Sequence, residues 1–145
     1  MFRILVVEDD KEVNKTVCAY LRQNYYDVSG CYSADEAFEE LYKKRFDLII
    51  TDIMMPDMDG FEFVRTIRAK TEELPILFMT ARDDFESKKR GFRLGIDDYM
   101  VKPIDLEELL LHIEALLRRA RLTAKKRLDI GNLSLDVEEH TAYVD

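Results

Sequence analysis

The sequence is poor in the residues on which several common classes of protein depend. Its 145 residues include two cysteines, three prolines, five glycines and no tryptophan. Cys18 and Cys31 fall inside predicted elements and lack the spacing of metal ligands, which indicates two buried free thiols. No signal peptide precedes the first apolar run, and no apolar run approaches the length of a membrane span. We therefore expect a cytoplasmic protein without membrane association.

Acidic residues are missing from one short stretch of an otherwise acidic chain. The formal net charge is −8, which argues against a generic DNA or membrane surface. A hydrophobic fraction of 47% and the chain length fit one ordinary domain with a short appendage. Residues 118–127 contain no acid and six bases, namely Arg118, Arg119, Arg121, Lys125, Lys126 and Arg127. A basic stretch therefore follows an acidic body.

Short apolar runs alternate with helical patterns over the first 119 residues. Strands are predicted at 3–7, 28–32, 47–51, 75–79 and 98–101, and helices at 11–24, 34–42, 61–67, 84–94 and 105–119. The second helix opens on a capping box, in which Ser33 and Glu36 satisfy reciprocal backbone donors. This alternation predicts an α/β fold with few possible topologies. We predict a doubly wound, flavodoxin-like parallel sheet of five strands in the order 2-1-3-4-5.

Carboxylates follow two of the predicted strands. The run 48–51 ends in Asp52, and the run 4–7 ends in Glu8, Asp9 and Asp10. These strands are neighbours in the predicted order, and open α/β sheets bind ligands at the carboxyl ends of their strands. Carboxylates held this close repel one another unless a hard cation lies among their oxygens. The sequence therefore predicts a divalent-cation site, at which we expect Asp10 to be a helix N-cap or an outer-shell group and not a direct ligand.

Five short motifs at strand ends occur in an order typical of one family. Together they resemble the receiver domain of two-component response regulators, and the resemblance covers residues 1–119. No single motif is specific, but the combination is. The motifs are Glu8-Asp9, Asp52 with Met55-Pro56 and Gly60, Thr80-Ala81, Tyr99, and Lys102-Pro103.

The resemblance implies a phosphorylation site. Asp52 would accept a phosphoryl group from a sensor histidine kinase, with Thr80 and Lys102 as the other catalytic residues. Mg²⁺ would be the cofactor, held by oxygens of Glu8, Asp9, Asp52 and the backbone carbonyl of Met54. The chain would catalyse only its own phosphorylation and dephosphorylation, so we do not expect a separate enzyme activity.

The same resemblance implies a switch. The phosphoryl group would draw Thr80 toward it, and Tyr99 would turn inward to fill the space behind the fourth strand. A half-buried packing role is the alternative for Tyr99. The peptide bond before Pro103 would be cis, which would aim Lys102 at the site.

The chain resembles the winged-helix (OmpR/PhoB-type) subfamily of transcription regulators, whose receivers form twofold dimers through helix four, strand five and helix five. Phosphorylation would favour the same homodimer here. Carried over by position, the pairs between copies would be Lys88 with Glu108, Asp97 with Arg119, Asp98 with His112, and Arg93 with Glu114. His112 stands where arginine is frequent, so its pair would be charged only when the imidazole is protonated. A solvated helix face is the alternative, since exposed pairs add little.

The pattern changes after residue 119. We assign 1–119 to the receiver (phosphoacceptor) domain, 120–127 to a basic linker and 128–145 to the start of a truncated winged-helix DNA-binding domain. The linker lacks the interleaved aromatic residues of a nucleic-acid patch. Short strands are expected at 128–136 and 141–145, although so small a piece of sheet is marginal alone. Without the recognition helix, promoter DNA would be a partner only of the full-length protein.

Other classes of protein fit less well. A Mg²⁺-dependent aspartyl phosphatase would carry a second acid two residues after its nucleophile, where this chain has Met54. A nucleotide-binding α/β domain would have a glycine-rich first turn instead of the acids after residue 7. A stand-alone receiver that acts through protein–protein contacts stays open beside the transcription regulator.

Overall fold

Five strands form one parallel sheet in the computed structural model, which describes the backbone of residues 1–136 and the side chains of residues 1–126. The strand order is β2-β1-β3-β4-β5, so the predicted flavodoxin-like α/β fold is confirmed. In chain order the elements are β1 (Arg3–Val7), α1 (Lys11–Gln23), β2 (Asp27–Cys31), α2 (Ala34–Lys43), β3 (Leu48–Thr51), α3 (Gly60–Lys70), β4 (Ile76–Thr80), α4 (Phe85–Leu94), β5 (Asp98–Val101) and α5 (Leu106–Asp136).

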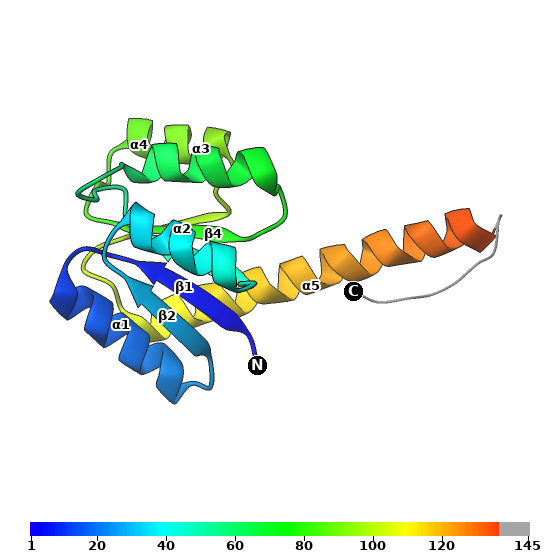
Figure 1. The fold of residues 1–145 in the computed structure, drawn as a ribbon, viewed down its shortest axis with the longest axis horizontal. Helices are drawn as coiled ribbons and strands as arrows, with labels where there is room; N and C mark the ends of the chain where they lie inside the picture. The colour runs from blue at the N-terminus through cyan, green and yellow to red at the C-terminus, as the bar shows by residue number, and fades with distance from the viewer. Residues whose placement is uncertain (137–145) are drawn as a thin grey trace.

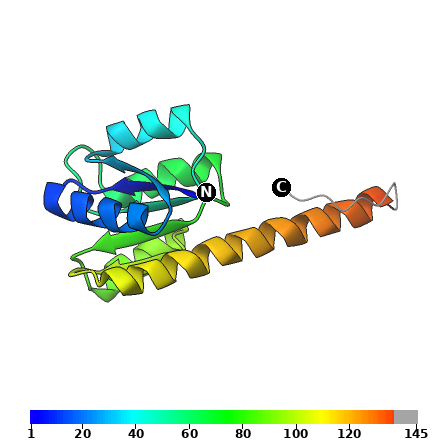
Figure 2. The same cartoon turned by 90° about the horizontal axis from the view of Figure 1, so that it is seen from below.

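Helices cover both faces of the sheet (Figure 1 and Figure 2). α1 and α5 pack on one face, and α2 and α3 pack on the other, with α4 beside α3. Along β1, Ile4 and Val6 join the core under α1 and α5, whereas Leu5 and Val7 join the core under α2 and α3. All four side chains are completely buried. A strand covered on both faces needs apolar residues at every position, which explains the continuous apolar runs in the sequence.

α4 approaches the sheet through its small residues. Ser87 and Gly91 are the buried residues of this helix. A Cβ atom at Gly91 would lie 2.8 Å from Cδ1 of Ile96 and 3.1 Å from Cε2 of Phe78, so the glycine permits the close contact. Most of the α4 surface therefore faces solvent, which agrees with the weak apolar pattern of its sequence.

The N-terminus of α2 differs in one hydrogen bond from the predicted capping box. The Ser33 hydroxyl accepts from the N–H of Glu36 at 3.2 Å, as expected. The Glu36 carboxylate, however, accepts from the N–H of Tyr32, the residue before the cap, at 2.9 Å. Asp57 completes the site, because its carboxylate accepts from the first two N–H groups of α2 at 3.1 and 2.9 Å. The loop after β3 is thereby attached to α2.

α5 is longer than the sequence predicts. The helix is expected to end near residue 119, but it continues to Asp136 and extends beyond the sheet (Figure 1). The linker assigned to 120–127 is therefore helical, and the strand expected at 128–136 is wrong. No proline follows Pro103, and the basic stretch consists mainly of good helix formers, so nothing ends the helix there. The strand expected at 141–145 lies outside the described residues, and the division into three units stays a prediction.

Within residues 106–126, the side chains that α5 contributes to the core come before residue 118. Its inward residues Leu109, Ile113, Leu116 and Leu117 belong to the core under α1. From residue 118 to residue 126 every side chain is at least partly exposed, and Leu122 is 59% exposed. Neither α5 nor any other helix within residues 1–136 combines the length and apolar character needed to cross a membrane.

Candidate functional site

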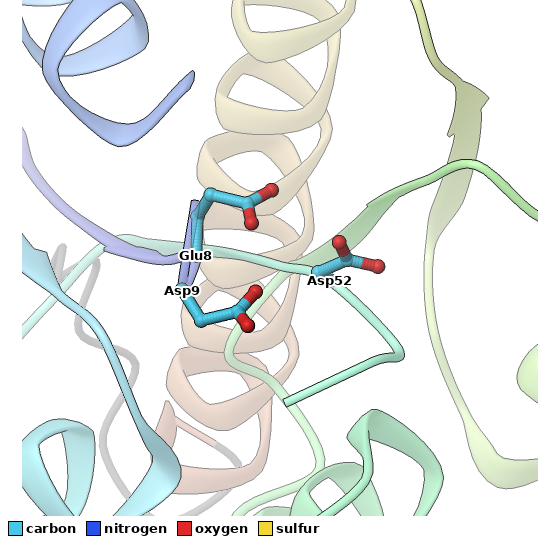
Figure 3. A group of neighbouring side chains, drawn as sticks. All are labelled: Glu8, Asp9 and Asp52. Carbon is cyan, nitrogen blue, oxygen red and sulfur yellow. The ribbon is translucent and has the colours of Figure 1, made fainter. Parts of the chain in front are cut away.

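Three carboxylates meet at the carboxyl end of the sheet. Glu8 and Asp9 follow β1, and Asp52 follows β3, its neighbour in the sheet. Figure 3 shows the three side chains gathered there, with one oxygen of each within 4.8 Å of the others. Glu8 is completely buried and Asp52 is 5% exposed, whereas Asp9 is open to solvent. The predicted juxtaposition of acids from two strands is therefore present.

Backbone contacts orient the Asp52 side chain. Its Oδ1 atom accepts hydrogen bonds from the N–H groups of Ile53 (2.6 Å) and Met54 (3.2 Å). The N–H of Gly60 donates to the Ile53 carbonyl at 2.6 Å, which holds this loop against the start of α3. A Cβ atom at Gly60 would lie 2.5 Å from the Asp52 carbonyl oxygen, so only glycine permits this approach. The second carboxylate oxygen, Oδ2, is left to face Lys102.

The Lys102 ammonium lies between two of the three carboxylates. Its Nζ atom donates to Oε1 of Glu8 at 2.5 Å and to Oδ2 of Asp52 at 2.7 Å. The peptide bond between Lys102 and Pro103 is cis, as predicted. The backbone N–H of Lys102 donates to the Thr80 carbonyl at 2.8 Å, which attaches this segment to the end of β4. Lys102 pairs with two of the three acids, so its single positive charge does not balance the cluster.

Burial and pairing shift the pKa values of two groups in the cluster. Burial raises the pKa of the Glu8 carboxyl, although the hydrogen bond from Lys102 acts in the opposite direction. Burial also acts to lower the pKa of Lys102, but hydrogen bonds to Asp52 and Glu8 outweigh it and leave that pKa above its ordinary value. The ammonium therefore stays charged at neutral pH and remains paired with the acids.

Thr80 and Tyr99 are linked through the backbone of Arg82. Thr80, at the end of β4, is completely buried, and its hydroxyl accepts from the N–H of Arg82 at 3.4 Å. The Tyr99 hydroxyl donates to the Arg82 carbonyl at 2.7 Å, and the half-buried ring packs edge-on against Phe78. Lys88 Nζ lies 5.8 Å from the centroid of the Tyr99 ring. Within residues 1–126, no hydrogen bond joins the Thr80 side chain to the acids.

The acids line an open cleft of about 530 Å³. Its other walls come from the loop after β3 and from Arg82, and Met54 at its rim is 57% exposed. The available donors are carboxylate oxygens and backbone carbonyls, which are hard ligands of the kind that Mg²⁺ prefers. The lining residues are Glu8, Asp9, Asp10, Asp52, Ile53, Met54, Met55, Pro56, Asp59, Arg82 and Lys102.

Asp10 lines this cleft but acts as a helix cap. Its Oδ1 atom accepts from the N–H groups of Glu12 (3.0 Å) and Val13 (3.2 Å) at the start of α1. The predicted N-cap role is confirmed. Asp10 also donates its own N–H to the Glu8 carboxylate at 2.9 Å, so the turn after β1 helps to orient Glu8.

Sequence reasoning missed Asn14, which supports the cluster from behind. Its side-chain amide donates to the backbone carbonyls of Glu8 (3.0 Å) and Cys31 (2.9 Å), and so joins the ends of β1 and β2. Asn14 is 4% exposed. A signal was present, because this polar residue precedes Val17 and Cys18 at helical spacing on the apolar face of α1.

The residues assigned to a dimer interface lie on α4, β5 and α5 and, for Asp97, in the loop before β5, and three of their acids (Asp97, Asp98 and Glu108) have partners within the chain. Asp97 pairs with Arg68 at 3.1 Å and accepts from the N–H of Ile76 at 2.9 Å. Asp98 lies 2.5 Å from Nδ1 of His112. The predicted pairs between two copies stay predictions.

Comparisons with known proteins identify relatives over the whole chain. The family profile described as response regulator receiver domain matches residues 4–114. Regulatory protein VanRB of Enterococcus faecalis is 41% identical over 143 residues, which are 99% of this chain and 64% of that protein. Transcriptional regulatory protein CiaR of Streptococcus pneumoniae is 36% identical over 145 residues, which are 100% of this chain and 64% of that protein. The chain thus spans less than two thirds of the length of these relatives.

A solved structure supports the same grouping. The crystal structure of a two-component response regulator from Clostridium difficile is similar with a TM-score of 0.79 and 30% sequence identity. The match covers 82% of this chain and 98% of that chain. Fold and sequence therefore point to the same relatives.

Proposed function

The chain belongs to the response regulator receiver domain family, and from this premise we propose that Asp52 accepts a phosphoryl group from a sensor histidine kinase. The observation that carries the proposal is the meeting of Asp52 with Glu8, Asp9 and Lys102 at one end of the sheet. A carboxylate can act as a nucleophile and hold a phosphoryl group as a mixed anhydride. The chain is then a signalling domain whose chemistry acts on itself.

The proposed transfer exchanges one bond to phosphorus for another. An oxygen of Asp52 forms a bond to phosphorus while the bond from phosphorus to the donor's imidazole nitrogen breaks, and that nitrogen keeps the electron pair. Such a transfer depends mainly on positioning and on neutralising charge at the phosphoryl oxygens. Lys102, 2.7 Å from Asp52, supplies one positive charge at this place. Among the side chains described, those of residues 1–126, the Thr80 hydroxyl accepts from the N–H of Arg82 and donates to no other group, so its own proton is available for a phosphoryl oxygen.

The cluster fits a bound Mg²⁺. Three carboxylates converge within 4.8 Å and one ammonium offsets only part of their charge. The ligands would be oxygens of Glu8, Asp9 and Asp52 and the backbone carbonyl of Met54. When bound, the ion supplies further positive charge beside the phosphoryl oxygens.

Tyr99 is placed to respond to the phosphoryl group. A phosphoryl group carries about two negative charges and would attract the Thr80 hydroxyl. Arg82 follows Thr80 by two residues and donates to its hydroxyl, so movement of Thr80 would also displace Arg82. The backbone carbonyl of Arg82 accepts the hydrogen bond from Tyr99. We expect Tyr99 to leave that carbonyl and turn inward on phosphorylation.

The wider assignment concerns the full-length protein. We propose that this receiver controls transcription through a winged-helix domain that binds promoter DNA, and that phosphorylated receivers pair through α4, β5 and α5. The support is the similarity over the whole chain to proteins such as a transcriptional regulatory protein, of which the chain covers 64%. A cytoplasmic location is part of the same proposal. The phosphatase alternative is not favoured, because Met54 occupies the position of its second acid.

Phosphorylation with a small donor tests the proposal. The protein incubated with acetyl phosphate and Mg²⁺ should gain about 80 Da, one phosphoryl group, by intact-mass spectrometry. Asp52→Asn should abolish the gain. Asp57→Asn is a matched control in the same loop, outside the cluster, and should retain it. A gain that persists in Asp52→Asn would remove Asp52 as the acceptor.

A further inference from the structure

Basic side chains line a groove between α3 and α4 in a protein whose formal net charge is −8. The two helices lie side by side (Figure 1), and the groove has a volume of about 530 Å³. Five bases and one acid line it, namely Arg65, Arg82, Lys89, Arg90, Arg93 and Glu86. The groove therefore carries a local charge opposite in sign to that of the whole chain.

The helical repeat directs these side chains to one place. Six lining residues come from α4, and the four charged ones among them include the pairs Glu86–Arg90 and Lys89–Arg93, each four positions apart, so they share one face of the helix. On α3, Phe61 and Arg65 are four residues apart and face the same groove. Arg82 lies in the loop between β4 and α4 and also lines the cleft at Asp52.

Most of these bases form no ion pair with another side chain of residues 1–126. Among residues 1–126, Arg82, Lys89, Arg90 and Arg93 have no carboxylate within 4.0 Å. Arg65 pairs with Glu62 at 3.7 Å, but both side chains are more than half exposed. Like charges on two adjacent helices repel one another, so an anion placed between them would remove that repulsion.

The floor of the groove is apolar and orients one of the bases. The guanidinium carbon of Arg90 lies 4.2 Å from the centroid of the Phe61 ring, which is itself only 2% exposed, and the partly exposed Leu94 supplies the apolar surface beside it. Stacking on the ring holds the planar guanidinium in place, with its N–H donors available to a carboxylate. The groove thus combines anion recognition with a hydrophobic contact.

We propose that this groove binds a short acidic peptide segment of a partner protein, with carboxylates against the bases and one apolar side chain against Leu94. The ten residues of α4 span about 15 Å, the length of about five residues of extended chain. A nucleic acid offers similar charge only as part of a long polyanion, which the acidic remainder of this protein would repel. The inference does not depend on phosphorylation of Asp52.

Fluorescence anisotropy with a fluorescein-labelled peptide, Glu-Asp-Glu-Leu-Glu-Asp-Glu, tests the proposal. Lys89→Glu with Arg93→Glu should weaken binding by about tenfold or more. Lys43→Glu with Arg45→Glu is the matched control, because these exposed bases outside the groove give the same change in net charge. The control should change binding by less than about threefold. Circular dichroism confirms folding, and the neutral pair Lys89→Gln with Arg93→Gln replaces any reversal that does not fold.

Two further arms test the details. Arg90→Lys keeps the charge but removes the planar fork, and should weaken binding by about threefold. Serine in place of the peptide's leucine should also weaken binding. The proposal is overturned by absence of saturable binding up to about 1 mM peptide, by equal losses in the groove and control variants, or by tighter binding of a single-stranded oligonucleotide of equal charge.

Discussion

Two regions of the molecule place a basic side chain between two carboxylates, and they differ in burial. At the end of the sheet, the Lys102 ammonium lies between Glu8 and Asp52, whose side chains are 1% and 7% exposed. At the surface of β5 and α5, the imidazole of His112 lies 2.5 Å from Asp98 and 3.8 Å from another acid of α5. That second acid, Glu108, is 61% exposed.

The difference shows that burial determines how strongly the same arrangement of charges stabilises the protein. In the buried cluster, backbone N–H groups hold the carboxylates of Glu8 and Asp52 in place, and both carboxylates pair with Lys102. Glu8 and Asp52 are almost fully buried there, so an unpaired charge on either carboxylate is costly, and a phosphoryl group would meet oriented partners. In the second cluster, the exposed cluster, the side chains of His112, Asp98 and Glu108 are 33%, 21% and 61% exposed, so water screens the same interactions more strongly.

Removal of the buried cation should give the largest change. Lys102→Met leaves Glu8 and Asp52 without their partner, and we expect the free energy of unfolding to fall by about 2 kcal/mol in EDTA. The loss is smaller than for a fully enclosed pair because the Lys102 side chain is 20% exposed. Urea denaturation measures it. Lys15→Met, at an exposed lysine of α1, is the control and should change stability little.

Mg²⁺ sharpens this test. If the acids bind the ion, millimolar Mg²⁺ should restore part of the stability of Lys102→Met, since a cation again lies among the oxygens. Equal stability of Lys102→Met and the unmodified protein in EDTA would contradict the view that the buried carboxylates need their cation.

Cys31 tests whether the interior beside the buried cluster excludes water. Its carbonyl accepts from the N–H of Glu8, and burial raises the pKa of its thiol to about 12, with Glu40 adding to the shift. The unfolded chain releases this proton near the ordinary value of 9.0. Stability should therefore fall as pH rises from 9 toward 12, by about 1 kcal/mol at about pH 10.

The Cys31→Ala variant isolates this contribution. Without the thiol, the free energy of unfolding should decline less steeply between about pH 8 and about pH 10 than it does in the unmodified protein. The slopes are compared rather than the absolute values, because the variant also loses a buried sulfur. Parallel slopes would show that the thiol ionises equally well in the folded state.

The sequence predicts what is local and periodic in this molecule. The interior strands β1, β3 and β4 are buried on both faces, so each is a continuous apolar run that can be recognised without the structure. Asp52 could be placed at the carboxyl end of an interior strand because it follows such a run directly. Its meeting with Glu8 and Asp9 required the strand order as well, and the alternation of elements made that order predictable.

What the sequence does not predict depends on partners far apart in the chain. Asp57 caps α2, 22 residues away, and Asp97 pairs with Arg68, 29 residues away. No periodicity marks such contacts. The predicted end of α5 is wrong for a different reason. The composition changes from acidic to basic at residue 118, but a change in charge does not end a helix unless a proline or a capping residue accompanies it.

The exposed cluster should give the smallest change. Asp98→Asn removes the charge beside His112 but keeps an oxygen that can accept from the N–H of Tyr99, as Asp98 does at 2.9 Å. We expect the free energy of unfolding to fall by only about 0.5 kcal/mol, because the side chains remain accessible to water. Glu107→Gln, at an exposed acid of α5 without a charged partner within residues 1–126, is the control. A loss as large as that of Lys102→Met, measured by urea denaturation in the same buffer, would mean that burial does not distinguish the two clusters.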